Sequence, residues 1–234
     1  MQFNKLLLIS IFLIFFSCNQ QEKNSNIDCD FSYLDLSYIK PIDAEDCEGV
    51  SIASKDSQES LLKGTILFDT VTQKYDLDTF EYKLRKGAFL MSKGALDSSI
   101  FYLLQAHEID SIDRVLNYNL GLYYIKVSDF EKAKFFTEKA FLRCPDNVPT
   151  LNQKGRILAT LGCYEKSFPF LRKAIRLDSN YHSAFINLTV AFYKSGNKDS
   201  ASYYLKLMDS RFPISGGQRE TSSDYWMKVR DELL

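Results

Sequence analysis

Histidine, cysteine and carboxylate side chains are the groups that most often bind metals or act in catalysis, and this chain has two histidines. His107 precedes Asp110 by three residues, so the two could share a helix face, but no third ligand stands nearby. His182 has no such neighbour. No serine carries the flanking pair of glycines of a nucleophile elbow. We therefore expect no metal site, no cofactor and no catalytic residue.

The charge of the chain is balanced. Its 29 Lys and Arg residues face 30 Asp and Glu residues, for a formal net charge of -1. Nucleic-acid binding rests on clustered basic residues, so we expect no nucleic-acid partner. Because no catalytic motif is present, we also expect no small-molecule substrate. Lys132, Lys134 and Lys139 come nearest to a basic run, but Glu131 and Glu138 interrupt them. This pattern is typical of a solvated helix face.

The amino terminus has the layout of a signal peptide. Lys5 supplies a positive charge, and residues 6–16 are apolar except for Ser10. A permanent membrane span needs roughly 20 apolar residues, so this run is too short to be one. It has the length of the apolar region of a secretory signal. We expect residues 1–17 to be a targeting signal and not part of the fold.

Ser17-Cys18 follows this run, and a polar stretch comes next. A small residue before a cysteine at this point resembles the lipobox of bacterial lipoproteins, although Phe15 and Phe16 depart from its usual residues. The resemblance implies that Cys18 is acylated and anchors the chain to a bacterial membrane at the cell envelope, on the outer-membrane or periplasmic side rather than the cytoplasmic one. Several acyl chains give durable anchoring. An ordinary cleaved signal peptide and an uncleaved anchor are the alternatives.

Small residues recur along the chain with a period of 34. Gly87, Gly121 and Gly155 form one column, and the next step lands on Thr189. Five further columns keep the same step: Gly94, Ser128, Gly162, Gly196; Ser99, Ala133, Ser167, Ala201; Ala106, Ala140, Ala174, Met208; Ser111, Pro145, Ser179, Pro213; and Leu90, Tyr124, Leu158, Phe192. The small columns predict places where two helices approach closely. The Gly94 column predicts a turn in which a left-handed backbone favours glycine.

This period and these residue types resemble the tetratricopeptide repeat. The second copy matches best, at Leu120-Gly121, Tyr124, Ala133, Ala140 and Pro145. The resemblance covers roughly residues 80–213. It implies an all-α fold: a right-handed superhelical solenoid of about four helix pairs, with capping helices at both ends.

The repeat register divides the chain. Asp56 and Glu59 look like a helix start, and Trp226, Val229 and Leu233 would share one face of a last helix. The predicted segments are a signal peptide (1–17), a lipidated cysteine with a tether and an apolar stretch (18–55), an amino-terminal capping helix (56–79), four repeats (80–113, 114–147, 148–181 and 182–213) and a carboxy-terminal loop with a capping helix (214–234).

In the repeat family the first helix of each pair lines a concave groove. Carried over by register, the candidate partner-binding residues are Tyr118, Leu122, Ile125, Lys126, Asn152, Arg156, Thr160, Ile186, Val190, Tyr193 and Lys194. This mixed surface suits an extended or helical peptide with some acidic character. Several of these residues could instead be core. Some members clamp a carboxy-terminal carboxylate with Lys and Asn on the first groove helix, but Leu84 and Ala88 stand there.

Four cysteines remain after Cys18. An exported protein meets oxidising conditions, which favour disulfides. The register places Cys144 and Cys163 at opposite ends of the helices, roughly 20 Å apart at 1.5 Å per residue, which is too far for a bridge. Cys29 and Cys47 are then the candidate disulfide. The alternative is that all four thiols are unpaired.

Residues 31–42 are too apolar for a free linker. We expect this stretch to fold back onto the helices, where it either caps the first ones or occupies the groove. The functional expectation is a membrane-anchored scaffold or assembly factor of the cell envelope, with a protein partner bound in the groove. The alternative is an accessory or inhibitory subunit of an envelope enzyme.

Overall fold

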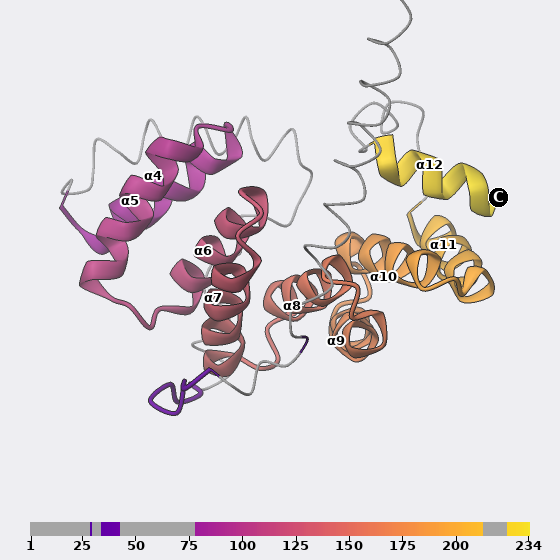
Figure 1. The fold of residues 1–234 in the computed structure, drawn as a ribbon, viewed down its shortest axis with the longest axis horizontal. Coiled ribbons are helices and arrows are strands. Elements are labelled where there is room, and N and C mark those ends of the chain that lie inside the picture. Colours follow the sequence, from indigo (N-terminus) through magenta and orange to yellow (C-terminus); the bar gives the residue numbers. More distant parts are fainter. Residues whose placement is uncertain (1–28, 30–33, 43–77, 213–223) are drawn as a thin grey trace, which may run out of the picture.

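The computed structural model describes residues 29, 34–42, 78–212 and 224–234 (Figure 1). Every regular element in these ranges is a helix: α4 (Phe80–Ser92), α5 (Leu96–Ile109), α6 (Arg114–Lys126), α7 (Phe130–Arg143), α8 (Val148–Thr160), α9 (Tyr164–Leu177), α10 (His182–Lys194), α11 (Lys198–Arg211) and α12 (Asp224–Leu233). Successive helices pack as antiparallel pairs, and the pairs stack in chain order. The predicted all-α class is confirmed. The signal peptide, Cys18 and residues 56–77 of the capping helix expected at 56–79 lie outside the described residues, while Asp78 and Thr79 precede α4 and are not helical.

The first helices of the early pairs begin at capping residues that are themselves 34 apart. The side chains of Thr79, Asp113 and Asn147 each accept a hydrogen bond from the backbone N–H three residues on, at 3.3, 2.7 and 3.2 Å. Such caps satisfy donors that the first helical turn leaves unpaired. The fourth copy breaks this column, because Tyr181 precedes α10 and its side chain makes no cap.

The turns inside the pairs use a left-handed residue, as the sequence predicts. Gly94, Gly162 and Gly196 have φ angles of 78°, 82° and 84°. The second copy has Ser128 in the same place, with φ 60°. Glycine adopts this region freely, whereas a side chain crowds the backbone there. Ser128 is therefore the one strained turn residue among these four copies.

The small-residue columns mark real contacts between paired helices. A Cβ atom on Gly155 would lie 2.5 Å from Leu171 Cγ, and one on Gly87 would lie 2.7 Å from Leu103. Ala140, in another column, is completely buried. These contacts leave no room for a larger side chain, so the predicted 34-residue register is correct.

The last helix packs as the sequence predicts. Trp226 and Val229 on α12 are buried against Phe185, Leu205 and Met208 of the fourth helix pair. The apolar face of α12 thereby closes the carboxy-terminal end of the core.

Two of the three lysines expected on a solvated face are buried. The Lys134 side chain has no exposed surface and Lys139 is 3% exposed, so this expectation was wrong for both. Lys139 Nζ donates a hydrogen bond to Ser111 O at 2.6 Å, which binds α7 to the loop before α6. The alternating charges of this segment indicated a helix. They did not indicate which face of that helix would be covered by the neighbouring helix pair.

Residues 34–42 fold back onto the helices, as predicted. Leu36 and Ile39 are buried. The Ile42 N–H donates to Arg143 O at 3.1 Å, and Arg143 Nη1 donates to Lys40 O at 2.9 Å. This stretch therefore docks at the carboxy-terminal end of α7. It lies neither on the first helices nor in the groove, so both locations proposed from the sequence were wrong for residues 34–42.

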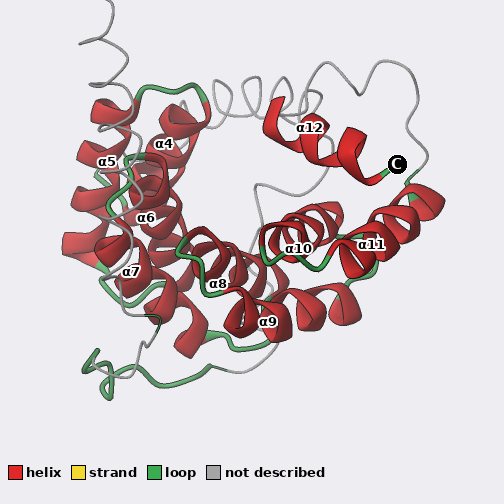
Figure 2. Cartoon of the chain, turned by 45° about the vertical axis from the view of Figure 1, so that its right-hand side comes forward, coloured by secondary structure: helices red, strands yellow, loops and turns green. Residues whose placement is uncertain are grey.

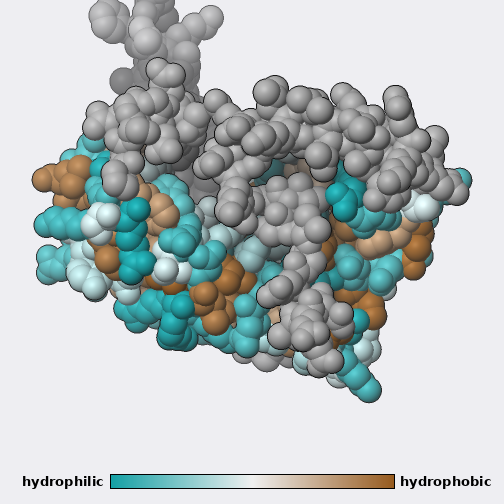
Figure 3. Space-filling model, turned by 180° about the vertical axis from the view of Figure 1, so that it is seen from behind, coloured by the Kyte–Doolittle hydropathy of each residue, from teal (hydrophilic) through white to brown (hydrophobic). Residues whose placement is uncertain are grey.

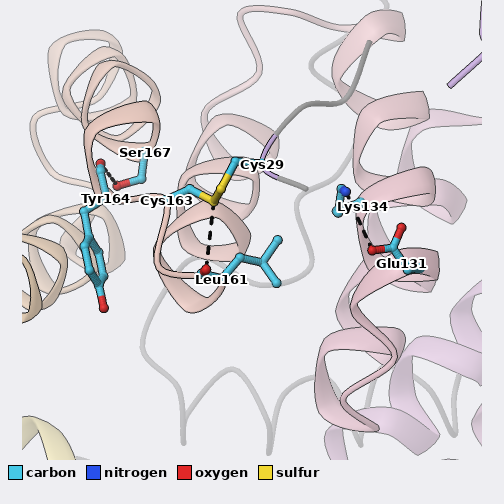
Figure 4. The surroundings of a disulfide bond; sticks show 7 residues. All are labelled: Cys29, Glu131, Lys134, Leu161, Cys163, Tyr164 and Ser167. Atoms are coloured by element: carbon cyan, nitrogen blue, oxygen red, sulfur yellow. Dashed lines mark hydrogen bonds and ion pairs between the residues drawn. A yellow bond between two sulfur atoms is a disulfide. The ribbon is translucent and has the colours of Figure 1, made fainter. Parts of the chain in front are cut away.

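The disulfide pairing also differs from the expected one. Cys29 is bonded to Cys163, with the two Cα atoms 6.0 Å apart, beside Leu161 (Figure 4). The predicted bridge from Cys29 to Cys47 is therefore wrong. The prediction treated Cys29 as part of a remote tether, whereas Cys29 lies in an apolar cluster at the turn between α8 and α9. Cys144 is also disulfide-bonded, and its partner is not Cys163, as the register required.

None of the helices in the described ranges combines the length and the apolar character that crossing a membrane requires.

Candidate functional site: the inner groove

The stack is curved, and the first helices of the pairs, α4, α6, α8 and α10, lie along its inner side (Figure 2). A pocket of about 250 Å³ opens where α6, α8 and α10 meet. It is lined by Tyr118, Leu122, Asn152, Gln153, Arg156, Tyr181, Ser183, Ile186 and Asn187. Three successive repeats thus contribute to one concavity.

The pocket brings together five of the residues predicted for the groove: Tyr118, Leu122, Asn152, Arg156 and Ile186. The predicted groove residues nearer the helix ends are not among its lining. Ile125 packs instead into the apolar cluster around Cys163. Lys126 is exposed at the last residue of α6, and the Thr160 hydroxyl donates back to the Arg156 carbonyl at 2.9 Å.

The predicted groove residues at the far end lie beneath α12. Val190 and Tyr193 pack against the cluster that contains Trp226. The Tyr193 hydroxyl is hydrogen-bonded to Glu232, and Lys194 Nζ lies 5.0 Å from the centroid of the Tyr225 ring. The carboxy-terminal helix therefore covers this part of the inner surface. Among the described residues, the pocket of this groove belongs to the second and third repeats and the start of the fourth.

A row of polar side chains crosses the pocket. Asn187 Nδ2 donates to Asn152 Oδ1 at 2.8 Å. The Tyr181 hydroxyl interacts with the Asn152 side chain and with the Tyr118 hydroxyl. Each hydroxyl can both donate and accept, so the contact between the two uses one of their two hydrogens.

A side chain of α8 binds the backbone of Tyr118 on α6. Gln153, which is 2% exposed, donates from Nε2 to Tyr118 O at 3.0 Å. The same amide nitrogen would lie 2.9 Å from a Cβ on Gly121, so the glycine makes room for it. This hydrogen bond of a buried side chain therefore joins α6 to α8 at the base of the pocket.

Arg156 brings the positive charge of the pocket. Burial lowers the pKa of its guanidinium, and the nearby hydroxyls of Tyr118 and Tyr181 oppose that shift. Burial also raises the pKa of both tyrosines, so at neutral pH they are uncharged and Arg156 is a cation. No carboxylate of the described residues forms an ion pair with it.

Sequence reasoning missed Gln153, Tyr181, Ser183 and Asn187. Tyr181 had a readable signal, because it stands where the other copies have Thr79, Asp113 and Asn147. A tyrosine at this position provides no helix cap, and such a cap typically contributes about 1 kcal/mol to stability. In the structure its hydroxyl lines the pocket instead.

Figure 3 shows one face of the molecule, seen from behind. Hydrophobic residues there form separate patches between hydrophilic ones, outside the part covered by residues drawn in grey. Scattered patches of this kind are normal for a protein surface.

The histidines stand apart from the groove pocket and from each other. His107 on α5 contacts the Phe136 ring edge-on, and His182 at the start of α10 contacts Phe212 in the same way. In the described part of the chain, no three His, Cys, Asp or Glu side chains gather as metal ligands would.

Antiparallel helix pairs that repeat every 34 residues around a concave inner surface define a helical-repeat protein. The family model of the tetratricopeptide repeat matches residues 116–147 and 148–181, which are the second and third copies. These two copies are thus similar to tetratricopeptide repeats.

Solved structures share the fold. A tetratricopeptide repeat protein from Parabacteroides merdae ATCC 43184 superposes with a TM-score of 0.56 at 15% identity, over 76% of each chain. MamA protein gives 0.52 at 16% identity, over 67% of this chain and 97% of that one. A thermophilic TPR protein of Thermus thermophilus gives 0.51 at 18% identity, over 56% and 74%. At these identities the likeness concerns the fold alone.

Among curated proteins, the CTR9 homolog of Arabidopsis thaliana is 34% identical over 71 residues. That segment is 30% of this chain and 6% of the plant protein, so the chain spans only a small fraction of that relative.

Proposed function

We propose that this protein is a membrane-anchored interaction scaffold or assembly factor of the bacterial cell envelope, and that it binds a segment of a partner protein in its inner groove. The observation that carries the proposal is the pocket shared by α6, α8 and α10. Tetratricopeptide-repeat proteins are protein-interaction scaffolds, and a groove of this kind admits a peptide with apolar and polar anchors.

The lining fits a segment with mixed chemistry. Leu122 and Ile186 offer apolar contact, while the amides of Asn152 and Asn187 and the Arg156 guanidinium offer donors. A bound segment would thus be oriented by polar groups and held by apolar ones. We infer a binding role rather than catalysis, because these groups include no nucleophile activated by a neighbouring base.

The envelope location rests on the sequence and on one structural feature. Ser17-Cys18 after the apolar run resembles a lipobox. The disulfide between Cys29 and Cys163 supports an exported protein, because such bonds persist in oxidising compartments. Replacing Cys18 with alanine should release the protein from the membrane fraction or block its processing. A Cys18→Ala protein that fractionates and migrates like the parent would refute the anchor.

The binding role is tested by co-purification from detergent-solubilised envelope, followed by mass spectrometry. Leu122→Ser removes an apolar contact of the groove, and Tyr203→Ser makes a comparable change on α11, where the side chain is 62% exposed. The partner should be lost with the first variant and kept with the second, at a temperature where both variants are folded, because Leu122 also packs against an apolar cluster of the core. Loss with Tyr203→Ser alone would place the binding surface on the outside. Recovery of one enzyme in stoichiometric amount, with its activity changed, would favour the accessory-subunit role.

A further inference from the structure

The pocket has an excess of donors. A row of polar groups runs from Asn187 through Asn152 to the hydroxyls of Tyr181 and Tyr118, which interact with each other. Two hydroxyls in contact have two hydrogens and use one of them between each other. The pair therefore retains one O–H donor.

The charge of the pocket is likewise unbalanced. Arg156 is half-buried, and its electrostatic neighbours are the neutral hydroxyls of Tyr118 and Tyr181. Arg114, the other cation near Tyr118, has the carboxylate of Asp113 beside it and donates to Asn147 Oδ1 at 3.3 Å. One cation thus lacks a counter-charge among the described residues. A half-buried guanidinium gains most from a carboxylate that it can bind through two parallel hydrogen bonds.

We infer that Arg156 and the Tyr118 hydroxyl form a subsite for one carboxylate, supplied by an Asp or Glu side chain within the bound partner segment. This inference rests on the proposed role of the groove and specifies what it recognises. A single negative charge matches the single uncompensated cation. Leu122 and Ile186, which line the same pocket, would contact apolar residues next to the acidic one.

Tyr181 explains why the fourth copy departs from the capping column. Asn147, one copy earlier, caps its helix by accepting from the Thr150 N–H. Tyr181 makes no cap, and its hydroxyl instead interacts with the Tyr118 hydroxyl. This contact restricts the directions in which the Tyr118 O–H can point. Tyr181 is accordingly a positioning residue for the subsite.

Three immobilised heptapeptides test the inference by surface plasmon resonance with the full chain in detergent. The first has alternating alanine and leucine around a central glutamate, with both ends blocked. The second has glutamine at the centre, and the third is the glutamine peptide with a free carboxy-terminal carboxylate. The glutamate peptide should bind about 10-fold more tightly than the blocked glutamine peptide, as expected for a charge-assisted hydrogen bond. Equal binding of these two, or tighter binding of the third, would overturn the inference.

Variants assign the effect to the pocket. Arg156→Gln should abolish the preference for glutamate, and Arg156→Lys should keep part of it. Arg176→Gln removes the same charge from an exposed position on α9 and should leave the preference intact. Tyr181→Phe should reduce the preference at a temperature where the variant is folded. Co-purification of the partner that depends on Leu122, together with equal binding of the glutamate and glutamine peptides, would support binding in the groove and refute only the carboxylate subsite.

Discussion

Arg230 and Asp209 form a two-pronged ion pair that fastens α12 to α11. Arg230 Nη1 lies 2.6 Å from Asp209 Oδ1, and Nη2 lies 2.6 Å from Oδ2. The arginine is 8% exposed, so water competes little for it. Planar pairs of this kind are among the stronger side-chain contacts.

We expect Arg230→Gln to lower the free energy of unfolding by about 2 kcal/mol, because it leaves the Asp209 carboxylate without its partner. Urea unfolding measures the loss, and faster hydrogen exchange in residues 224–233 should accompany it. Asp231→Asn, an exposed change on the same helix, is the control. Unchanged exchange in α12 would mean that the pair does not hold this helix.

Replacing Ser128 with glycine should stabilise the protein. Its φ of 60° is costly for a side chain and easy for glycine, and the other three copies have glycine there. We expect a gain of about 0.5–1 kcal/mol after the greater freedom of the unfolded glycine is deducted. Ser210→Gly on the exposed side of α11 should instead lose about 0.5 kcal/mol. A loss at Ser128 as large as that at Ser210 would show that the turn is not left-handed.

Adding one methyl group at Gly155 should weaken the third repeat. The new Cβ would lie 2.5 Å from Leu171 Cγ, so α8 and α9 would have to separate. We expect Gly155→Ala to lower the free energy of unfolding by about 1–3 kcal/mol, as overpacking typically does. Thermal unfolding by circular dichroism measures this, with the exposed Thr160→Ala on the same helix as control. A rise in stability, as expected of alanine in an open helix, would place Gly155 away from the pair contact.

Non-reducing peptide mapping should join Cys29 to Cys163 and show Cys144 in a separate bridge. The first bond closes a loop of 134 residues, which should stabilise the fold by roughly 4–5 kcal/mol on the chain-entropy account. Cys29→Ser and Cys163→Ser should therefore cost about the same, and the double variant no more than either alone. Additive losses would mean that the two cysteines act separately. A peptide linking Cys29 to Cys47 would contradict the structure.

The repeat architecture could be predicted from sequence because it depends on local sterics. A position such as Gly155 has no room for a side chain in the first three copies, so the same constraint returns every 34 residues and is visible as a column, although the fourth copy has Thr189 there. Trp226 and Val229 share one helical face, which is equally a local property.

The remaining features depend on contacts between distant segments. No local pattern states that Cys29 reaches Cys163, or that α12 covers Val190 and Tyr193. For Tyr181, the sequence shows that a tyrosine replaces the capping residue of the other copies. It does not show that this tyrosine lines a pocket. The pocket lies on α6, α8 and α10, which are helices that the sequence assigned to the groove, while α12 covers the assigned residues farthest toward the carboxy terminus.

Site-specific photo-cross-linking in intact cells tests the central claim most directly. Benzoylphenylalanine at Leu122 stands in the groove, and the same group at Tyr203 stands on the exposed surface of α11. The account predicts one discrete protein adduct from Leu122, mapped to a single segment of the partner, and none from Tyr203. Adducts from Tyr203 alone, or the same adducts from both positions, would show that the partner does not bind in the groove.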